Sequence, residues 1–363
     1  MLRIYGRFDR EHNTRKALMV CGSANLSGNS FSMSLKILVV TAMFPHAGHE
    51  GSGAFVMQQV EQLRALGHSV DILHFRGYRS KLEYIKAAIE VRRRTRAAHY
   101  DVVHAHYGVT GTAALFRRAT PLVVTLHGSD ALLGWVEPLI SRCVCRFADA
   151  TIVVSRKMAA KIPGEIIPCG VDLSVFAPQE RAEARNRLGL ALEKRYVLFP
   201  FNPARRVKRF DLARAAVDRL VAGGLNVELL TVSQVPNREM PWYYSAADAM
   251  LLCSDSEGSP TAVKEALACN LPVVSTEVGD VSEILEGIRG VQVCEQNPDA
   301  LAAGLSTSLV RPKDFVFNGR SAMQRYSQER TVRAIVRVYS RVVERRDLSR
   351  RERRHAASLP DRS

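Results

Sequence analysis

Residues 249–276 read AMLLCSDSEGSPTAVKEALACNLPVVST and contain the unit from which the fold can be deduced. Two short apolar runs, Ala249–Ser254 and Pro272–Thr276, have the composition of buried strands. Between them, Thr261–Ala268 is patterned as a helix, and Pro260 suits the first position of a helix. Strand, helix and strand in this order are typical of a parallel sheet that helices cover on both faces.

The same alternation begins at Lys36 and is interrupted only by the charged segment 178–195, which holds one short helical stretch. Before the interruption we expect strands at Lys36–Val40, Ser69–Leu73, Asp101–Ala105, Pro121–Leu126 and Ala150–Val154, with helices at Ala54–Ala65, Leu82–Ala98 and Glu137–Phe147. After it we expect strands at Tyr196–Phe201, Val227–Val232, Ala249–Ser254, Pro272–Thr276 and Gly290–Cys294, with helices at Asp211–Ala222, Thr261–Ala268 and Pro298–Leu309. The pattern predicts an α/β protein with two Rossmann-like, doubly wound domains facing a cleft, where ligands bind beyond the carboxyl ends of the strands.

These patterns also set the expected domain boundaries. Residues 1–34 form a leader that is disordered or not translated, in which case Met33 is the true start. The two domains are expected at 35–178 and 179–328, followed by a helix at 329–345 and a basic tail at 346–363. The last helix has apolar residues at helical spacing and no strand after it, so we expect it to cross back to the first domain.

The composition is that of a globular protein, since 47% of the 363 residues are apolar and 24% are charged. The seven cysteines are scattered and odd in number, which favours reduced, buried thiols and gives no complete zinc site. No apolar stretch is long enough for a transmembrane helix or a signal peptide, so we expect a cytoplasmic protein. The net charge of +15 gathers in segments 1–16, 76–98 and 341–363, and such patches attract nucleic acid or acidic lipid.

The predicted helix at Thr261–Ala268 offers an anion site at its start. Ser259 suits the N-cap and Pro260 the first helical position, so the free N–H groups of the helix would face the cleft. Glu257 precedes this helix and Glu265 lies within it, so both carboxylates can accept hydrogen bonds from the hydroxyl groups of one ligand. The two residues alone also fit a simpler interpretation, in which Glu257 is a helix N-terminal charge and Glu265 a solvated surface residue.

The spacing of Glu257 and Glu265 resembles the E-x7-E motif of the retaining family 4 glycosyltransferases, which have the GT-B fold. The dipeptides that begin with the two glutamates and the sequence Pro272-Val273-Val274 match that family too, and the resemblance extends over residues 36 to about 345. In that family the first glutamate contacts the donor sugar and the second contacts the ribose of the nucleotide. The resemblance therefore implies donor contacts from both glutamates and from the residues after the first, which are Gly258, Ser259, Pro260 and Thr261.

The loop after the first strand of the second domain resembles the arginine and lysine pair that grips the donor diphosphate in this family. The resemblance implies that a lysine and one of two arginines hold the phosphates, and the candidates are Asn202, Arg205, Arg206 and Lys208. A fixed clamp of this kind stabilises a phosphate leaving group strongly. The loop departs from the family at Pro203 and Arg209, where glycines are usual, and a solvated basic loop is the alternative.

His127 closes a predicted strand, and His127-Gly128 resembles the family's pair in which the histidine lies beside the donor sugar. The residues alone favour a histidine that is bonded to neighbouring backbone. His104 and His106 end another strand and are expected to be supporting residues at most.

Two loops resemble further parts of the family's site. Gly51, Ser52 and Gly53 resemble its acceptor-side loop, and they lack the third glycine of a dinucleotide fingerprint. Glu283 resembles a glutamate near the nucleotide, although Asp280 and Glu283 also have the spacing of a capping box.

The resemblance implies a retaining hexosyltransferase that moves a sugar from a nucleoside-diphosphate sugar to a hydroxyl group of a glycan or lipid-linked acceptor. We expect this reaction in the assembly of a bacterial surface polysaccharide. No carboxylate stands out as a covalent nucleophile and the chain has no D-x-D sequence, so we expect no bound metal and no cofactor besides the donor.

The basic segment Leu82–Arg96 has Leu82, Ile85 and Ile89 on one face of its predicted helix. Such a helix can rest on an acidic membrane, here the inner face of the plasma membrane, and an ordinary solvated helix fits equally well. Three other functions stay open: a catalytically silent GT-B protein that binds nucleotide or glycan, a sugar-nucleotide epimerase, and a nucleic-acid-binding protein. The glutamates and Lys208 argue against the first, and the lack of a binding motif leads us to expect no nucleic-acid partner.

Overall fold

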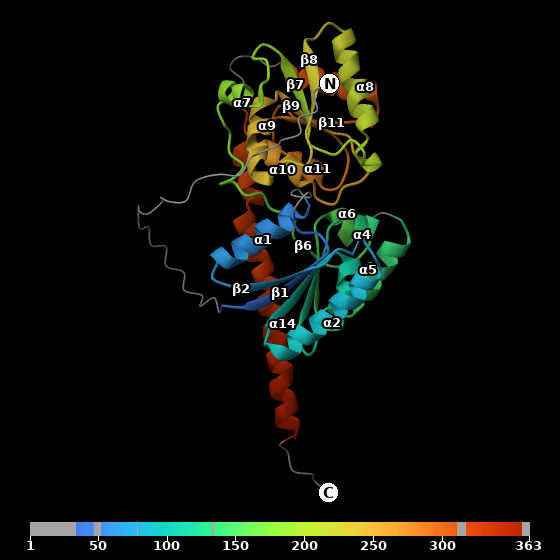
Figure 1. Cartoon of the computed structure of the whole chain (residues 1–363), viewed down its shortest axis with the longest axis vertical. Coiled ribbons are helices and arrows are strands. Elements are labelled where there is room, and N and C mark those ends of the chain that lie inside the picture. Colours follow the sequence, from blue (N-terminus) through green and yellow to red (C-terminus); the bar gives the residue numbers. More distant parts are fainter. Residues whose placement is uncertain (1–33, 47–51, 78, 133, 311–316, 358–363) are drawn as a thin grey trace, which may run out of the picture.

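The chain forms two parallel β-sheets flanked by helices, one in each half of the sequence (Figure 1). The computed structural model describes residues 34–46, 52–77, 79–132, 134–310 and 317–357. The predicted leader therefore lies outside the described residues up to Met33, as do Gly51 and the end of the tail, 358–363.

The first half contains β1 (Lys36–Thr41), α1 (Ala54–Ala65), β2 (Ser69–His74), α2 (Leu82–Ala97), β3 (Val102–His106), α3 (Gly108–Ala114), β4 (Leu122–Leu126), α4 (Ser129–Leu132), α5 (Val136–Arg146), β5 (Ala150–Val153), α6 (Arg156–Ala159) and β6 (Glu165–Ile166). The second half contains α7 (Arg181–Leu188), β7 (Arg195–Phe199), α8 (Phe210–Ala222), β8 (Val227–Thr231), α9 (Met240–Ala246), β9 (Ala249–Leu252), α10 (Thr261–Ala268), β10 (Val273–Thr276), α11 (Val281–Leu285), β11 (Gln292–Cys294), α12 (Pro298–Leu309), α13 (Gly319–Ala322) and α14 (Gln328–Ala357), with short 3-10 turns at Arg206–Lys208, Asn237–Glu239 and Met323–Tyr326. The strand orders are β2-β1-β3-β4-β5-β6 and β11-β10-β9-β7-β8, and all pairs are parallel. The predicted fold class of two doubly wound α/β units is confirmed.

Every predicted strand and helix is present with small shifts at its ends. Several short elements were not assigned ranges from the sequence, namely β6 and the helices α3, α4, α6, α9, α11 and α13. The sequence of α3, GVTGTAA, contains two glycines, which disfavour a helix. Packing explains why it forms, because a Cβ atom at Gly108 would lie 1.9 Å from Ser141 Oγ and one at Gly111 would lie 2.5 Å from Val144 Cγ1. The glycines therefore let α3 pack directly against α5.

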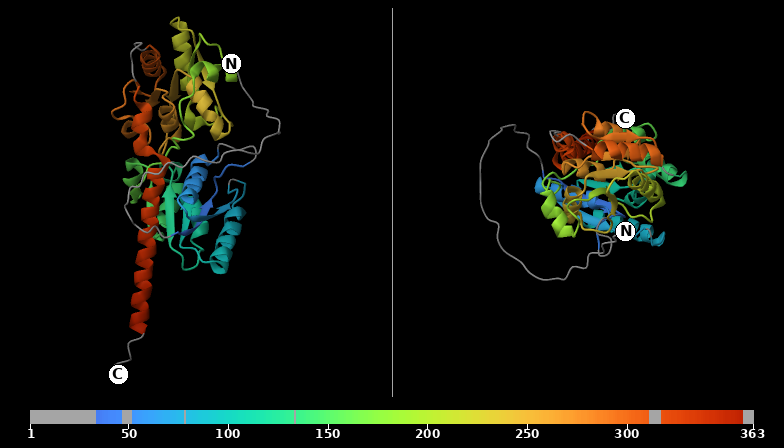
Figure 2. Two further views of the ribbon diagram at one scale, coloured as in Figure 1. Left: turned by 90° about the vertical axis from the view of Figure 1, so that its left-hand side faces the viewer. Right: turned by 90° about the horizontal axis from the view of Figure 1, so that it is seen from above.

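The last helix, α14, covers the sheet of the first half (Figure 2). Alternate residues of β1 point to opposite faces, and Ile37 and Val39 share a buried cluster with Val332 and Ile335 of α14. The predicted crossing back is thus confirmed, and the helix continues beyond its expected end at Arg345 to Ala357. Among the described residues, no helix combines the length and the apolar composition that crossing a membrane requires. The described cysteines form no disulfide, and all except the exposed Cys143 are at least partly buried.

Two segments connect the halves, one around Val171 and one around Tyr326, and they lie side by side. Val171 N donates to Tyr326 O across 2.9 Å, and Gln328 N donates to Val171 O across 2.8 Å. The guanidinium group of Arg320 donates to backbone carbonyl oxygens of the first connection, including Leu173 O at 2.9 Å. These hydrogen bonds hold the two connecting segments together.

Candidate functional site

A cavity of about 580 Å³ lies between the two halves, at the carboxyl ends of their strands. It brings together most of the residues singled out in the sequence, namely Ser52, Gly53, His127, Asn202, Arg205, Lys208, Glu257, Gly258, Ser259, Pro260, Thr261 and Glu265. Arg206 and Glu283 do not line it, and Gly51 lies outside the described residues. The geometry therefore favours Arg205 over Arg206 as the arginine of the cleft.

Glu283 lies away from this cavity on α11. Its carboxylate pairs with Arg156 at 3.4 Å, and its side chain is 46% exposed. Asp280 occupies the N-cap position of α11 without a capping hydrogen bond from its side chain, so the capping box is not formed either. Glu283 therefore neither lines the cavity in which a nucleotide would bind nor forms a capping box with Asp280.

The start of α10 differs from the prediction. The helix begins at Thr261 with Pro260 in the N-cap position, and no side chain caps it. Ser259 instead donates to Asp280 Oδ2 at 2.7 Å and accepts a hydrogen bond from Lys264 Nζ. The prediction that Ser259 is the N-cap was wrong, because the fully buried ammonium group of Lys264 draws the hydroxyl inward.

Glu265 lies at the cleft, where it is partly buried. Tyr244 Oη donates to Glu265 Oε2 across 2.8 Å. Desolvation by burial raises the pKa of Glu265 to about 7, although the bonds from Tyr244 and Thr261 act in the opposite direction. The alternative of a solvated surface residue does not fit, and near neutral pH the side chain is divided between its protonated and ionised forms.

Lys208 and Glu257 form an ion pair within the cleft. Lys208 Nζ donates to Glu257 Oε1, and the two side chains are only 9% and 14% exposed. The same ammonium group stands 4.3 Å from the centre of the Phe201 ring. The pair places one cation and one carboxylate acceptor at a single point of the cavity, where a phosphate group would compete for the lysine.

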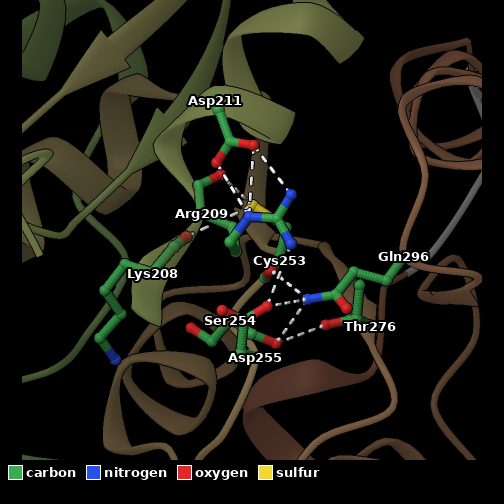
Figure 3. A network of polar contacts seen from close by, with 8 residues as sticks. All are labelled: Lys208, Arg209, Asp211, Cys253, Ser254, Asp255, Thr276 and Gln296. Carbon is green, nitrogen blue, oxygen red and sulfur yellow. Dashed lines mark hydrogen bonds and ion pairs between the residues drawn. The ribbon is translucent and has the colours of Figure 1, made fainter. Parts of the chain in front are cut away.

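Arg209, which stands where a glycine is usual, holds this loop in place (Figure 3). Its backbone takes the left-handed conformation with φ 51°, and its guanidinium group bonds to Asp211 at 2.8 Å and to Asp255 at 3.1 Å. Gln296 binds the same segment through Ser254 O at 3.2 Å and Asp255 Oδ1 at 2.9 Å. Arg209 thereby joins the basic loop to the loop that precedes α10.

Asp130 fixes the loop that carries His127 and is a site residue that the sequence analysis missed. Its carboxylate accepts hydrogen bonds from the backbone N–H groups of His127 at 3.0 Å, Gly128 at 2.9 Å and Gly108 at 3.1 Å. Burial raises the pKa of Asp130 to about 6, against the effect of these donors. An aspartate two positions after a glycine is a turn signal that could have indicated this role.

The imidazole of His127 lines the cavity, and the rings of His106 and His104 follow behind it, away from the cavity. His127 Nε2 is 2.9 Å from His106 Nδ1, so the ring bonds to a side chain and not to neighbouring backbone. Burial lowers the pKa of His127 well below its usual value, which keeps the ring neutral. His104 and His106 are fully buried and have no contact with the cavity, as expected of supporting residues.

The two halves touch backbone to backbone at Gly128 and Gly258. A Cβ atom on Gly258 would lie 2.0 Å from His127 O, and one on Gly128 would lie 2.8 Å from Gly258 Cα. Only glycine permits this approach. Across the described residues, no group of three or more His, Cys, Asp or Glu side chains is placed to hold a metal ion.

Known proteins resemble this chain in sequence. The family model described as Glycosyltransferase Family 4 matches residues 49–175, and that of glycosyl transferases group 1 matches residues 207–310. The teichuronic acid biosynthesis glycosyltransferase TuaC of Bacillus subtilis is 29% identical over 348 residues, covering 75% of this chain and 88% of TuaC. A D-inositol 3-phosphate glycosyltransferase of Mycolicibacterium gilvum is 31% identical over 299 residues, covering 68% of this chain and 67% of that protein.

Solved structures are similar in fold. Sucrose-phosphate synthase from Thermosynechococcus elongatus has a TM-score of 0.67 at 19% identity, covering 85% of this chain and 99% of its own. Anabaena HepE in complex with UDP-glucose has a TM-score of 0.60 at 17% identity, covering 84% of this chain and 99% of its own. At these identities the likeness concerns the fold alone.

Proposed function

Because this chain belongs to glycosyltransferase family 4, whose enzymes use nucleotide sugars and retain the anomeric configuration, we propose that it builds a lipid-linked or cell-surface polysaccharide. In this role it transfers a sugar to an acceptor hydroxyl group. The name of the similar protein TuaC, a teichuronic acid biosynthesis glycosyltransferase, supports a surface polymer as the product. Residues 35–178 are then the acceptor-side domain and residues 179–328 the donor-side domain.

The observation that carries the proposal is the cleft itself, in which cations, a free helix start and carboxylates from one half face His127 of the other. The diphosphate binds at the start of α10, where unpaired N–H groups and the helix dipole favour an anion, with Lys208 and Arg205 beside it. Glu265 accepts hydrogen bonds from the ribose, and Glu257 accepts from the sugar.

The proposed reaction follows a same-face substitution. The bond between the sugar C1 atom and the β-phosphate oxygen breaks, and the acceptor oxygen bonds to C1 on the same face. The acceptor proton passes to the leaving diphosphate, whose negative charge Lys208 and Arg205 stabilise. Glu257 is engaged with Lys208, which supports a role as hydrogen-bond acceptor and not as nucleophile.

We also propose that α2 rests on an acidic membrane, on its cytoplasmic face, where a lipid-linked acceptor is reached. Leu82, Ile85 and Ile89 are 61%, 58% and 64% exposed, and Arg92 and Arg93 follow on the next turn. Ile85 and Ile89 line an apolar groove of about 390 Å³ between α2 and α3. An apolar strip that ends in cationic side chains complements acyl chains beneath anionic headgroups.

Further exposed apolar side chains lie on neighbouring helices. Phe116 follows α3 and is 59% exposed, while Trp135 and Leu139, before and on α5, are 80% and 59% exposed. Since α3 packs between α2 and α5, these side chains belong to the same side of the sheet.

Thermal unfolding with UDP, GDP and ADP tests the donor site. UDP comes first because the similar HepE structure holds UDP-glucose. A ligand at about 100 times its dissociation constant adds about 2.7 kcal/mol to the free energy of unfolding, which a melting curve resolves. We expect one nucleotide to stabilise the protein, Glu265→Gln to weaken that effect, and the exposed control Glu193→Gln to leave it unchanged.

Product analysis with the matching sugar nucleotide separates the remaining alternatives. Transfer to an acceptor with retained configuration supports the proposal. An isomerised donor without transfer would indicate an epimerase, and nucleotide binding without either product would indicate a silent binding protein. Stabilisation by a salt-matched DNA duplex and by no nucleotide would overturn the proposal.

A further inference from the structure

Three histidine rings form a buried chain that leads from the last helix to the cleft. The ring centres of His104 and His106 are 4.3 Å apart, and those of His106 and His127 are 5.2 Å apart. Gln59 of α1 places its Nε2 atom 3.3 Å from His104 Nδ1 and 3.4 Å from His106 Nε2. Tyr339 of α14 places its hydroxyl 2.6 Å from His104 Nδ1. One carboxamide thus contacts two rings of the chain.

The carboxamide determines which nitrogen atom of each ring carries the proton. Burial lowers the pKa of His106 to about 3, so the ring is neutral and has one N–H group. The Gln59 nitrogen can only donate, so His106 Nε2 accepts and the His106 proton is on Nδ1. His106 Nδ1 then donates to His127 Nε2 across 2.9 Å, which places the His127 proton on Nδ1.

The other branch of the chain agrees with this assignment. His104 Nδ1 has a single lone pair, and we assign it to the short bond from the Tyr339 hydroxyl, with Gln59 Nε2 in a longer contact at 3.3 Å. The His104 proton is then on Nε2. That nitrogen lies 2.7 Å from Thr125 Oγ1, which can accept the bond. Each of the two buried rings therefore has a partner at both nitrogen atoms.

His127 ends the chain with a donor that has only a weak partner. Among the described residues, the atom bonded to His127 Nδ1 is Cys169 Sγ at 3.9 Å. Burial raises the pKa of the Cys169 thiol to about 11, so it stays a neutral thiol and a weak acceptor. Both residues line the cavity. The His127 N–H group is therefore available to an oxygen atom of a bound molecule.

We propose that Gln59 is a positioning residue that fixes the tautomers of this chain, so that His127 presents an Nδ1–H donor to a substrate oxygen. The presence of substrate in the cleft rests on the proposed function, whereas the tautomer assignment does not. The amide acts through His106 and touches no substrate itself. The chain also makes the donor of His127 depend on α14 through Tyr339, which lies more than two hundred residues further along the sequence.

Nitrogen-15 NMR of the ligand-free, full-length protein with labelled histidines tests the assignment directly. Long-range proton–nitrogen correlations distinguish a protonated ring nitrogen from an unprotonated one. We expect protons on Nδ1 of His106 and His127 and on Nε2 of His104. A proton on His127 Nε2 in the native protein would overturn the proposal, because it requires the opposite orientation of the Gln59 amide.

Gln59→Glu supplies a second test, because a carboxylate can only accept. We expect it to place a proton on His106 Nε2 and to lower kcat/KM for sugar transfer about tenfold, as a substrate oxygen would lose its donor. Gln58→Glu, one position along the same helix and buried to a similar extent, is the control for general destabilisation. If the nitrogen-15 signals of the histidine rings are the same in Gln59→Glu as in the native protein, the proposal is wrong. If the native protein gives the expected histidine spectrum but transfers sugar from no donor, the proposed function is wrong and the tautomer assignment stands.

Discussion

The hydroxyl group of Tyr244 donates to Glu265 Oε2 across 2.8 Å and joins α9 to α10 at the edge of the cleft. Tyr244 is fully buried, so this bond satisfies a hydroxyl group that has no access to water. The carboxyl group is thus held in place before any ligand arrives. Its desolvation makes it sensitive to pH in the range where the protein is expected to work.

Glu265→Gln is expected to stabilise the ligand-free protein at high pH. The folded-state pKa is raised from 4.5 to about 7, so the fold favours the protonated form. This contribution to stability is complete below pH 4.5 and is lost as the pH rises through 7. We expect the free energy of unfolding of the variant to exceed that of the native protein by on the order of 3 kcal/mol at pH 8 and to match it at pH 4.5.

Urea unfolding across this pH range measures the effect. The same variant should bind nucleotide more weakly, since an amide replaces the carboxylate proposed to face the ribose. If the free energies of unfolding of the native protein and of Glu265→Gln change with pH in the same way, Glu265 is solvated in solution.

Lys208→Met is expected to reduce kcat for sugar transfer about a hundredfold, because the leaving diphosphate loses a fixed cation. The side chain of methionine still covers Phe201, so the change removes charge more than packing. It also leaves Glu257 unpaired within the cleft. Steady-state kinetics with saturating donor measures the loss, and the exposed Lys157→Met serves as the control. Native kcat in Lys208→Met would remove Lys208 from the proposed phosphate site.

Gly258→Ala is expected to abolish transfer while nucleotide binding persists. The added Cβ would lie 2.0 Å from His127 O, so the two halves must separate, whereas the proposed nucleotide contacts all come from the second half. Calorimetric titration with nucleotide and a transfer assay on the same sample make the comparison. Gly223→Ala, whose new Cβ would meet nothing closer than 3.4 Å, controls for the substitution itself. Full transfer activity in Gly258→Ala would mean that this contact is not part of the active form.

Arg209→Ala is expected to be less stable than Arg209→Gly. Both variants lose the bonds to Asp211 and Asp255, but only alanine keeps the cost of the left-handed backbone at φ 51°. The difference should be about 1 kcal/mol in the free energy of unfolding, measured in urea. Equal stabilities would show that the backbone relaxes once the guanidinium group is gone.

A double change, Ile85→Ser with Ile89→Ser, is expected to weaken binding to acidic vesicles about tenfold or more, because two exposed apolar side chains lose their place among acyl chains. Co-sedimentation with phosphatidylglycerol vesicles gives the affinity, and added salt should lower it. Val221→Ser, on the exposed face of α8 in the second half, is the control. Equal binding of native protein to neutral and acidic vesicles would contradict the charged contact, and binding to neither would exclude a membrane role for α2.

Much of the fold could be predicted because the strands of a parallel sheet are buried on both faces and appear as continuous apolar runs, such as Ala249–Leu252. The helix α3 could not, since its glycines read as a turn until α5 is known to lie against them. The reach of α14 to Ala357 was also missed, because its charged end buries nothing that periodicity could reveal.

The residues of the site could likewise be predicted only in part. Residues close together in sequence, such as Glu257 and Glu265, could be assigned to one cleft from their spacing around a helix start. Partnerships between distant elements could not, and Ser259 shows why: Asp280 and Lys264 compete for its hydroxyl group only once the chain has folded. The same reason hid the contact of Gln59 with His106.

The return of α14 to the first sheet has a consequence for biosynthesis. While the ribosome makes the chain, the sheet face bearing Ile37 and Val39 has no cover from Val332 and Ile335, which are synthesised some three hundred residues later. The half that emerges first is therefore the half that is completed last. Until the final helix leaves the exit tunnel, that apolar face is open to chaperones and to other nascent chains. A ribosome that stops near Gln328 would release a chain with both sheets complete but without α14, the helix that covers the first sheet.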